Sequence, residues 1–242
     1  YNQLGVNTEY AFPAGALLEI SAEPEYTDGK KRVVDLSLSV GVQAGTAGAE
    51  LGQLAFVLKD AKDKVLNTGS DLNGVLAVFT ALVKDGHDPF VSLRMDDAVT
   101  LKAANGLVSI LQSIDTETGI RMEPPAPGQL YYRAFAPDPS FRDREGRVAQ
   151  PWELRLAKKD GVVSGVLSEI KQTWKEEQVK PDIQVKDYPV ASGQDLRKEL
   201  DARGPGLRVV IIFAQPAVTL KELMGFVQAV QKTHPIIHVF VE

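Results

Sequence analysis

The sequence predicts an α+β fold, with an α/β fold as the alternative, in which two homologous units each carry a mixed β-sheet with helices packed on one face. Three observations predict it. Segments that alternate in polarity every two residues are interspersed with segments whose apolar residues recur at helical spacing. Short motifs recur in the same order in both halves of the chain. The most apolar run, at 209–214, is typical of an inner strand buried on both faces.

The repeat is clearest where the residues Ala-Val-Thr-Leu-Lys at 98–102 recur at 217–221. Weaker matches precede it in the same order: Leu36-Ser37-Leu38 with Leu154-Arg155-Leu156, 58–60 with 185–187, and 69–72 with 193–196. The stretch richest in proline and glycine, at 123–128, separates the two halves. We therefore expect a tandem duplication with a first unit at 1–122 and a second unit at 123–242.

In the first unit, the segments 17–22 and 33–42 alternate in polarity on either side of a turn signal at 27–30, so they are expected to form a hairpin. In the second arm, the even positions from Leu36 to Val42 are apolar and are expected to share one buried face. The remaining predicted elements are a strand at 54–59, a helix at 71–83, a strand at 90–95, a helix at 100–113 and a strand at 119–122.

The second unit is expected to repeat this order with an additional or longer helix. This helix is predicted at 162–178, because apolar residues including Val163, Ile170 and Trp174 fall on one helical face there. The remaining predicted elements are a strand at 183–186, a helix at 195–202, a strand at 207–214, a helix at 219–232 and a strand at 236–241.

Composition limits the function classes. Lys and Arg total 27 against 32 Asp and Glu, which gives a formal net charge of −5, so we expect no nucleic-acid partner. The absence of cysteine removes thiol nucleophiles, thiolate metal ligands and disulfides. No segment approaches the ~20 apolar residues that span a bilayer. The chain begins at Tyr1 rather than Met, so membrane association is expected only through a segment that precedes it.

In each half, an apolar strand is followed by a short turn and then by a helix. In the second half the strand at 209–214 leads through Gln215 to Val-Thr-Leu at 218–220, and in the first half Met95-Asp96 leads to Val-Thr-Leu at 99–101. This pattern resembles the periplasmic domain of the ExbD/TolR family of biopolymer-transport accessory proteins, in which the strand ends in Ala-Asp and Val-Pro-Tyr or a similar triplet opens the helix. Gln215 departs from that Asp, whereas Asp96 retains it.

The resemblance implies a non-enzymatic module of the cell envelope. It implies a periplasmic or otherwise extracytoplasmic location, with anchorage to the inner membrane as one form of it. It also implies a partner that is either an envelope protein or peptidoglycan. Because domains of this family tend to pair, it allows a homodimer or a pair of units within one chain. No motif in the sequence indicates a cofactor, and we expect none.

Aromatic and arginine side chains alternate at the start of the second half and form the candidate binding set. Aromatic rings stack on sugars or bases, and arginine binds phosphate or carboxylate groups through two hydrogen bonds. The candidate binding residues are Tyr132, Arg133, Arg142, Arg144, Arg147 and Trp152. The alternative is a hairpin whose aromatic rings pack inside the unit, with neighbouring acidic residues that neutralise much of the charge.

Two other motifs carry oxygen ligands. Asp35, Ser37 and Ser39 match the Asp-x-Ser-x-Ser pattern of metal-dependent adhesion sites in von Willebrand A domains, which would make the chain a soluble ligand- or metal-binding protein of adhesion type. The alternative is the polar face of a half-exposed strand. Asp96 and Asp97 form a carboxylate pair that fits either acid–base chemistry or a turn before a helix. We expect no metal site and no catalytic residues.

Overall fold

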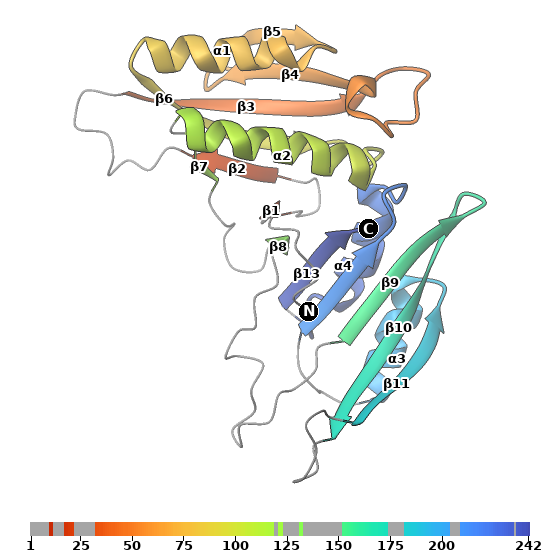
Figure 1. Cartoon of the computed structure of the whole chain (residues 1–242). Helices are drawn as coiled ribbons and strands as arrows, with labels where there is room; N and C mark the ends of the chain where they lie inside the picture. Colours follow the sequence, from red (N-terminus) through yellow and green to blue (C-terminus); the bar gives the residue numbers. More distant parts are fainter. Residues whose placement is uncertain are drawn as a thin grey trace. The chain divides into compact units, whose positions relative to one another are not determined.

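The computed structural model of the chain describes residues 10–11, 17–21, 32–118, 121–122, 131–132, 152–173, 182–203, 209–234 and 236–242. Contacts within the chain divide it into two compact units, one within Tyr10–Gln129 and one formed mainly by Leu130–Val218 and Glu222–Glu242. Each unit holds one mixed β-sheet and two α-helices (Figure 1). The α+β prediction is confirmed.

The N-terminal unit is a six-stranded sheet with two helices. Its elements are β1 (Tyr10–Ala11), β2 (Leu17–Ser21), β3 (Arg32–Val42), the 3-10 turn η2 (Leu51–Gln53), β4 (Leu54–Asp60), β5 (Val65–Gly69), α1 (Leu72–Lys84), β6 (His87–Met95), α2 (Leu101–Thr118) and β7 (Arg121–Met122). The strand order is β5-β4-β3-β6-β2-β7, and β1 is not part of this sheet. Only β3 and β6 are parallel, and the other neighbours are antiparallel.

The C-terminal unit is built on a five-stranded sheet. Its elements are β8 (Tyr131–Tyr132), β9 (Trp152–Lys159), β10 (Val162–Thr173), β11 (Asp182–Val190), α3 (Gly193–Ala202), β12 (Val209–Ala214), α4 (Leu220–Val230) and β13 (Ile236–Val241). The strand order is β11-β10-β9-β12-β13, and β8 is not part of this sheet. Strands β9, β12 and β13 run parallel, whereas β9, β10 and β11 are antiparallel to one another in turn.

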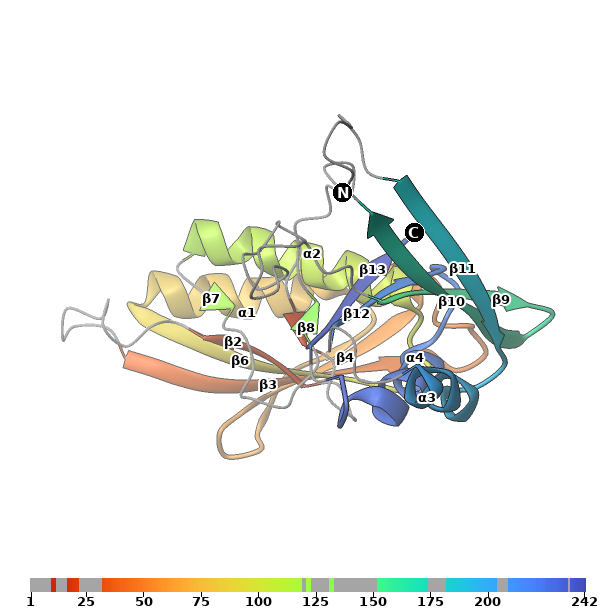
Figure 2. The ribbon, with the colours of Figure 1, turned by 90° about the horizontal axis from the view of Figure 1, so that it is seen from below.

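Each sheet buries one face against its helices, which lie together on that face in both units (Figure 2). In β3, Leu36, Leu38 and Val40 are buried, while Asp35 and Ser37 on the other face are exposed, as the alternation predicts. In β12, every residue from Val210 to Ala214 is buried, so both faces of this inner strand are covered. That prediction is also confirmed, because Ile211 and Phe213 on one face and Val210, Ile212 and Ala214 on the other are all buried.

The two units share the topology of four strands and two helices. The order β3-β4-β5-α1-β6-α2 in the N-terminal unit matches β9-β10-β11-α3-β12-α4 in the C-terminal unit, and the sheet orders β5-β4-β3-β6 and β11-β10-β9-β12 agree. The turns after β6 and β12 also agree: the Asp96 N–H donates to the Val40 carbonyl at 2.8 Å, and the Gln215 N–H donates to the Leu156 carbonyl at 3.0 Å. This agreement supports the interpretation that the units are homologous.

The equivalent turns correct the details of the sequence alignment. They match Val40 with Leu156, so Leu38 corresponds to Leu154 and the earlier match of Leu36 with Leu154 is displaced by one pleat. The segment 58–60 lies in β4, whereas 185–187 lies in β11, so these two segments are not equivalent. The N-cap residues of α1 and α3 are Asp71 and Ser192, so these two are equivalent. The earlier match of 69–72 with 193–196 set Asp71 against Asp195 and is therefore displaced. An alternating motif matches at any even offset, which is why the sequence alone displaced the match of Leu36 with Leu154.

The helix predicted at 162–178 is wrong, because 162–173 form strand β10. Strand β9 reaches β10 through Asp160 and Gly161, whose φ angles of 51° and 80° are those of a two-residue hairpin turn. Beyond the turn, Val162, Val163 and other β-branched residues favour an extended chain. Their spacing fits both a helical face and a strand, and the pairing with β9 decides between them. Residues 174–178 lie outside the described residues.

The hairpin predicted between 17–22 and 33–42 is also wrong. Strand β6 lies between β2 and β3 and pairs with both, so that Leu93 stands opposite Leu18 on one side and Leu38 on the other. Strand β6 takes the place in the sheet between β3 and β2, and its apolar residues Val91, Leu93 and Met95 are all buried. Strand β5 was not predicted. The turn signal at 27–30 lies outside the described residues.

Helix α3 begins in close contact with helix α4, at Gly193 and Gly225. A Cβ atom added to Gly193, at the start of α3, would overlap the carbonyl oxygen of Gly225 in α4 and lie 3.0 Å from the Cβ of Ala229. A Cβ added to Gly225 would meet no atom within 4 Å. The close approach therefore depends on Gly193 and not on Gly225.

We expect Gly193→Ala to lower the free energy of unfolding by about 1–3 kcal/mol, because the new methyl group forces the two helices apart. Gly225→Ala is the matched control, and we expect it to leave stability unchanged or to raise it by up to ~1 kcal/mol through its better helix propensity. Urea unfolding followed by circular dichroism measures both values. Equal effects of the two substitutions would contradict this account of the helix contact.

Candidate functional site

The aromatic and arginine set predicted from the sequence falls mostly on parts of the chain outside the described residues. Arg133, Arg142, Arg144 and Arg147 lie there, and only the backbone of Tyr132 is described, in β8. Trp152 opens β9, and only 7% of its surface is exposed. Its indole ring therefore packs inside the C-terminal unit, as in the alternative interpretation, and is not available to stack on a ligand.

The three residues of the Asp-x-Ser-x-Ser motif lie in a row along one strand. Asp35, Ser37 and Ser39 occupy alternate positions of β3, on the face opposite the helices. Alternate residues of a strand are about 6.6 Å apart, so Asp35 and Ser39 are separated by about 13 Å. A Mg²⁺ ion requires its oxygen ligands within about 2.1 Å. One ion cannot be held by this row, and no cluster of three metal-ligating side chains occurs within the described ranges.

Ser39 instead contributes to a pocket that sequence analysis did not predict. The pocket has a volume of about 490 Å³ and lies where β3 and β6 end side by side. Its lining residues are Ser39, Val40, Gly41, Ala55, Val57, Arg94, Met95, Asp96 and Asp97. The pocket thus brings together Ser39 and the Asp96–Asp97 pair, which the sequence presented as separate motifs.

Arg94 supplies the positive charge of this pocket. It stands opposite Ser39 in the parallel register of β3 and β6, on the sheet face without helices. Its side chain is exposed and forms no ion pair with any residue in the described part of the chain. The predicted strand at 90–95 already contained the signal, because a charged residue between the apolar residues Leu93 and Met95 faces away from the core.

The two carboxylates of the pocket have different local roles. The Asp96 side chain accepts a hydrogen bond from the Ala98 N–H at 2.8 Å, and the Asp96 carbonyl accepts one from the Val99 N–H at 3.0 Å. Asp96 therefore shapes the turn between β6 and α2, in agreement with its turn-forming interpretation. Asp97 is exposed beside it. An arginine and a carboxylate at the rim suit a ligand that carries both charges, such as a peptide.

A second candidate surface lies at the outer edge of the C-terminal sheet. Strand β11 ends the strand order, and Ile183 and Val185 on it are each 58% exposed. Val185 pairs with Ile170 in β10, and Val166 in the same strand is 37% exposed. Exposed apolar side chains on an edge strand are typical of a protein-binding surface, because most edge strands carry charges that discourage pairing.

The other face of β11 is fixed to the unit by a polar cluster. The Tyr188 hydroxyl donates a hydrogen bond to Glu169 in β10 at 3.0 Å, and the Arg203 guanidinium, at the end of α3, lies 3.3 Å from the centre of the Tyr188 ring. Glu169 also forms an ion pair with Lys171 at 3.1 Å. Partial burial raises the pKa of Glu169, but the hydrogen bonds from Lys171 and Tyr188 outweigh it and hold this pKa below its ordinary value.

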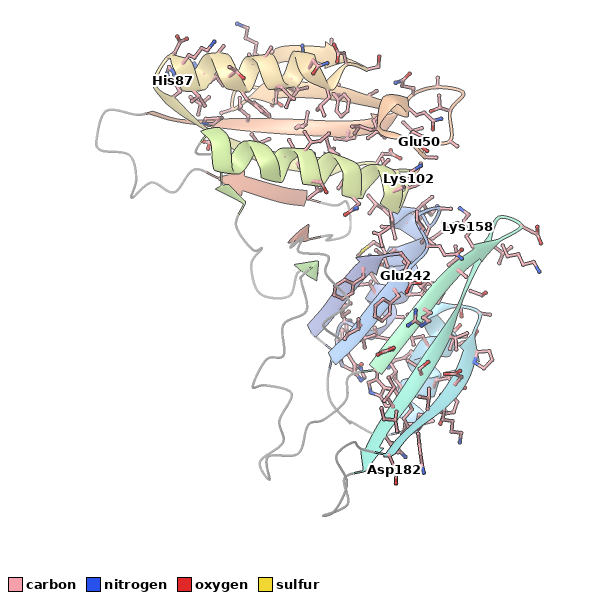
Figure 3. The ribbon with its side chains drawn as sticks, in the orientation of Figure 1. Glu50, His87, Lys102, Lys158, Asp182 and Glu242 are labelled. Carbon is pink, nitrogen blue, oxygen red and sulfur yellow. The ribbon has the colours of Figure 1, made fainter. Side chains whose placement is uncertain are left out.

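Two basic residues of strand β9 are already paired within the unit. Arg155 in β9 forms an ion pair with Glu242 at 2.6 Å, and its guanidinium lies 4.6 Å from the centre of the Phe213 ring. Lys158, at the end of β9 (Figure 3), forms an ion pair with Glu222 of α4 at 2.9 Å. These contacts satisfy the charges internally, so they stabilise the unit and do not offer a site for an ionic ligand.

The function of the chain has to be argued from its own residues, because neither a scan against protein-family models nor a search of curated proteins finds a match. Among the described residues, none of the helices combines the length and the apolar character needed to cross a membrane.

We expect Glu169→Gln to lower the thermal midpoint at pH 7 and to have a smaller effect at acid pH. Because the pKa of Glu169 is lower in the folded chain than its ordinary value of 4.5, its charge stabilises the fold above about pH 4.5, and this contribution disappears as the pH falls through the folded pKa. Thermal unfolding of both proteins between pH 3 and pH 7 measures the difference. A difference that does not shrink toward pH 3 would contradict the assigned interaction.

Proposed function

We propose that this protein is a non-enzymatic interaction module of the cell envelope, similar to the periplasmic part of ExbD/TolR transport accessory proteins, and that it acts by contact with an envelope protein or with peptidoglycan. The proposal places it in the periplasm or another extracytoplasmic space. A membrane segment before Tyr1 would anchor it there. The module works without a cofactor.

One observation carries the proposal. Strand β12, the turn at Gln215, helix α4 and the parallel strand β13 follow one another in the order on which the resemblance depends. The same strand, turn and helix occur as β6, Asp96 and α2 in the N-terminal unit, with the same turn hydrogen bonds. A motif that is present twice with matching backbone contacts is a stronger basis for the resemblance than either copy alone.

The pocket of the N-terminal unit offers a surface for such contact. Peptidoglycan and extended protein segments both present carboxylates, which an exposed guanidinium binds through two hydrogen bonds. Arg94 holds this position at the rim. The lining residues Gly41, Ala55 and Val57 have small side chains, which leave space for an extended chain to lie against the sheet. The pocket lies on the face of the sheet opposite the helices, so ligand binding there does not require the core to open.

We expect the full-length protein in its native host to be recovered in the envelope fraction. We also expect it to become accessible to added protease when the outer membrane is permeabilised. Fractionation followed by immunoblotting and the intact mass of the recovered protein measure this. A full-length protein that is found only in the cytosol and begins close to Tyr1 would overturn the proposed location and the function with it.

We expect Arg94→Glu to weaken cosedimentation of the purified protein with peptidoglycan, or cross-linking to its envelope partner, by about fivefold or more, because a carboxylate repels the ligand that the guanidinium attracts. Lys62→Glu is the matched control, since Lys62 is exposed in the turn between β4 and β5 and makes the same change of charge outside the pocket. Equal losses in both variants would show that the pocket is not the contact surface.

A further inference from the structure

Strand β11 is the outermost strand of the C-terminal sheet among the strands that the structure describes. One of its edges pairs with β10 over its whole length, and no described strand pairs with the other edge. All residues from Asp182 to Asp187 are exposed. An edge of this kind presents unpaired N–H and C=O groups that a second strand can extend.

The residues of this segment are complementary to themselves when two copies run antiparallel. With the two-fold axis at Gln184, Ile183 stands opposite Val185 of the second copy, and Asp182 stands opposite Lys186 of the second copy. Opposed residues of an antiparallel pair lie on the same face of the sheet, so the apolar residues meet on one face and the opposite charges meet on the other. Each contact occurs twice, as two-fold symmetry requires.

We propose that the protein forms a symmetric dimer through antiparallel pairing of β11 with β11 of a second copy, centred on Gln184. The existing register extends the apolar contact, because Val185 already stands opposite Ile170 of β10. In the dimer, three apolar residues therefore lie in a row across the junction between the two sheets. Ile170 and Val185 belong to one copy, and Ile183 belongs to the second copy. The pairing joins the two five-stranded sheets into one.

The sequence of β11 favours this register over its neighbour. If the axis passed through Val185, Ile183 would stand opposite Asp187 of the second copy, and Gln184 opposite Lys186. That register places Ile183 against a carboxylate and sets neither Asp182 nor Lys186 opposite a residue of opposite charge. Pro189 lacks an N–H, so it limits the ladder to the first part of the strand. A short contact of this size predicts a weak dimer that dissociates on dilution.

Other occupants fit the strand less well. A strand of a different protein would need its own matching sequence, whereas the second copy supplies both the apolar and the charged complement. The polar cluster of Tyr188, Glu169 and Arg203 connects β11 to its own unit through β10 and α3. Asp182 lies at the beginning of this strand and is exposed (Figure 3).

Single cysteines test the register, because the chain contains none of its own. In Gln184→Cys, the two thiols face each other at the axis, within the Cα separation that a disulfide requires. Air oxidation with copper–phenanthroline is expected to convert most of this variant to a disulfide-linked dimer. Lys186→Cys is the control on the same strand, since its thiols would lie about 13 Å apart and should remain reduced. Equal cross-linking of both variants, or none in Gln184→Cys, would overturn the proposal.

Charge exchange tests the same pairing without a covalent bond. Asp182→Lys and Lys186→Asp each place like charges opposite one another, and we expect either to weaken dimerisation at least about fivefold in sedimentation equilibrium. The double variant restores opposite charges and should return within about twofold of the original constant. Circular dichroism confirms that each variant is folded.

Val185→Lys should abolish the dimer, while Val65→Lys, on the equivalent edge strand β5 of the N-terminal unit, should not. A chain that is monomeric at all concentrations, or a double variant as weak as its single parents, would overturn the proposal. If the chain is monomeric and the β11 variants no longer bind an envelope partner, the edge of β11 is the binding site of that partner and not of a second copy. None of these results depends on where the protein resides, so the dimer and the proposed envelope function fail independently.

Discussion

The parallel pairing of β3 with β6, and of β9 with β12, is the constraint on which the rest of both units depends. Parallel neighbours cannot be joined by a tight turn, so the chain has to cross over one face of the sheet before it returns. Helices α1 and α3 make this crossing, and each buries its apolar side against the sheet on the way. The same pairing brings the ends of the two strands together, which creates the turn at Asp96 or Gln215.

The crossover also determines which parts of each unit remain available for contact. The antiparallel strands that precede the helix, β4 with β5 and β10 with β11, are displaced outward to one side of the sheet. In both units the last of these strands becomes the edge, but the two edges carry different residues. In β11 the exposed positions combine Ile183 and Val185 with opposite charges, whereas β5 exposes Val65, Thr68 and Gly69 and carries no charged residue. Equivalent positions in the fold therefore offer different surfaces.

Residues whose role is set by local pattern were predictable from the sequence. Leu36, Leu38 and Val40 alternate with polar residues, and a half-buried strand follows from that alternation alone. Features set by pairing between distant segments were not. The helical spacing around Val163 was overruled by the turn at Asp160–Gly161 and by the register with β9. The pocket could not be predicted for the same reason, since Ser39 and Arg94 meet only because β3 and β6 are parallel neighbours.

The burial of Trp152 gives this chain a built-in optical probe of one half. The sequence contains two tryptophans, Trp152 and Trp174, and both belong to the C-terminal half. Indole emission therefore reports on solvent entry into that half, whereas far-ultraviolet dichroism records the helices and strands of both. When the two signals are followed during the same denaturation, coincident curves mark a single cooperative transition, and separate curves mark two units that lose their structure in succession.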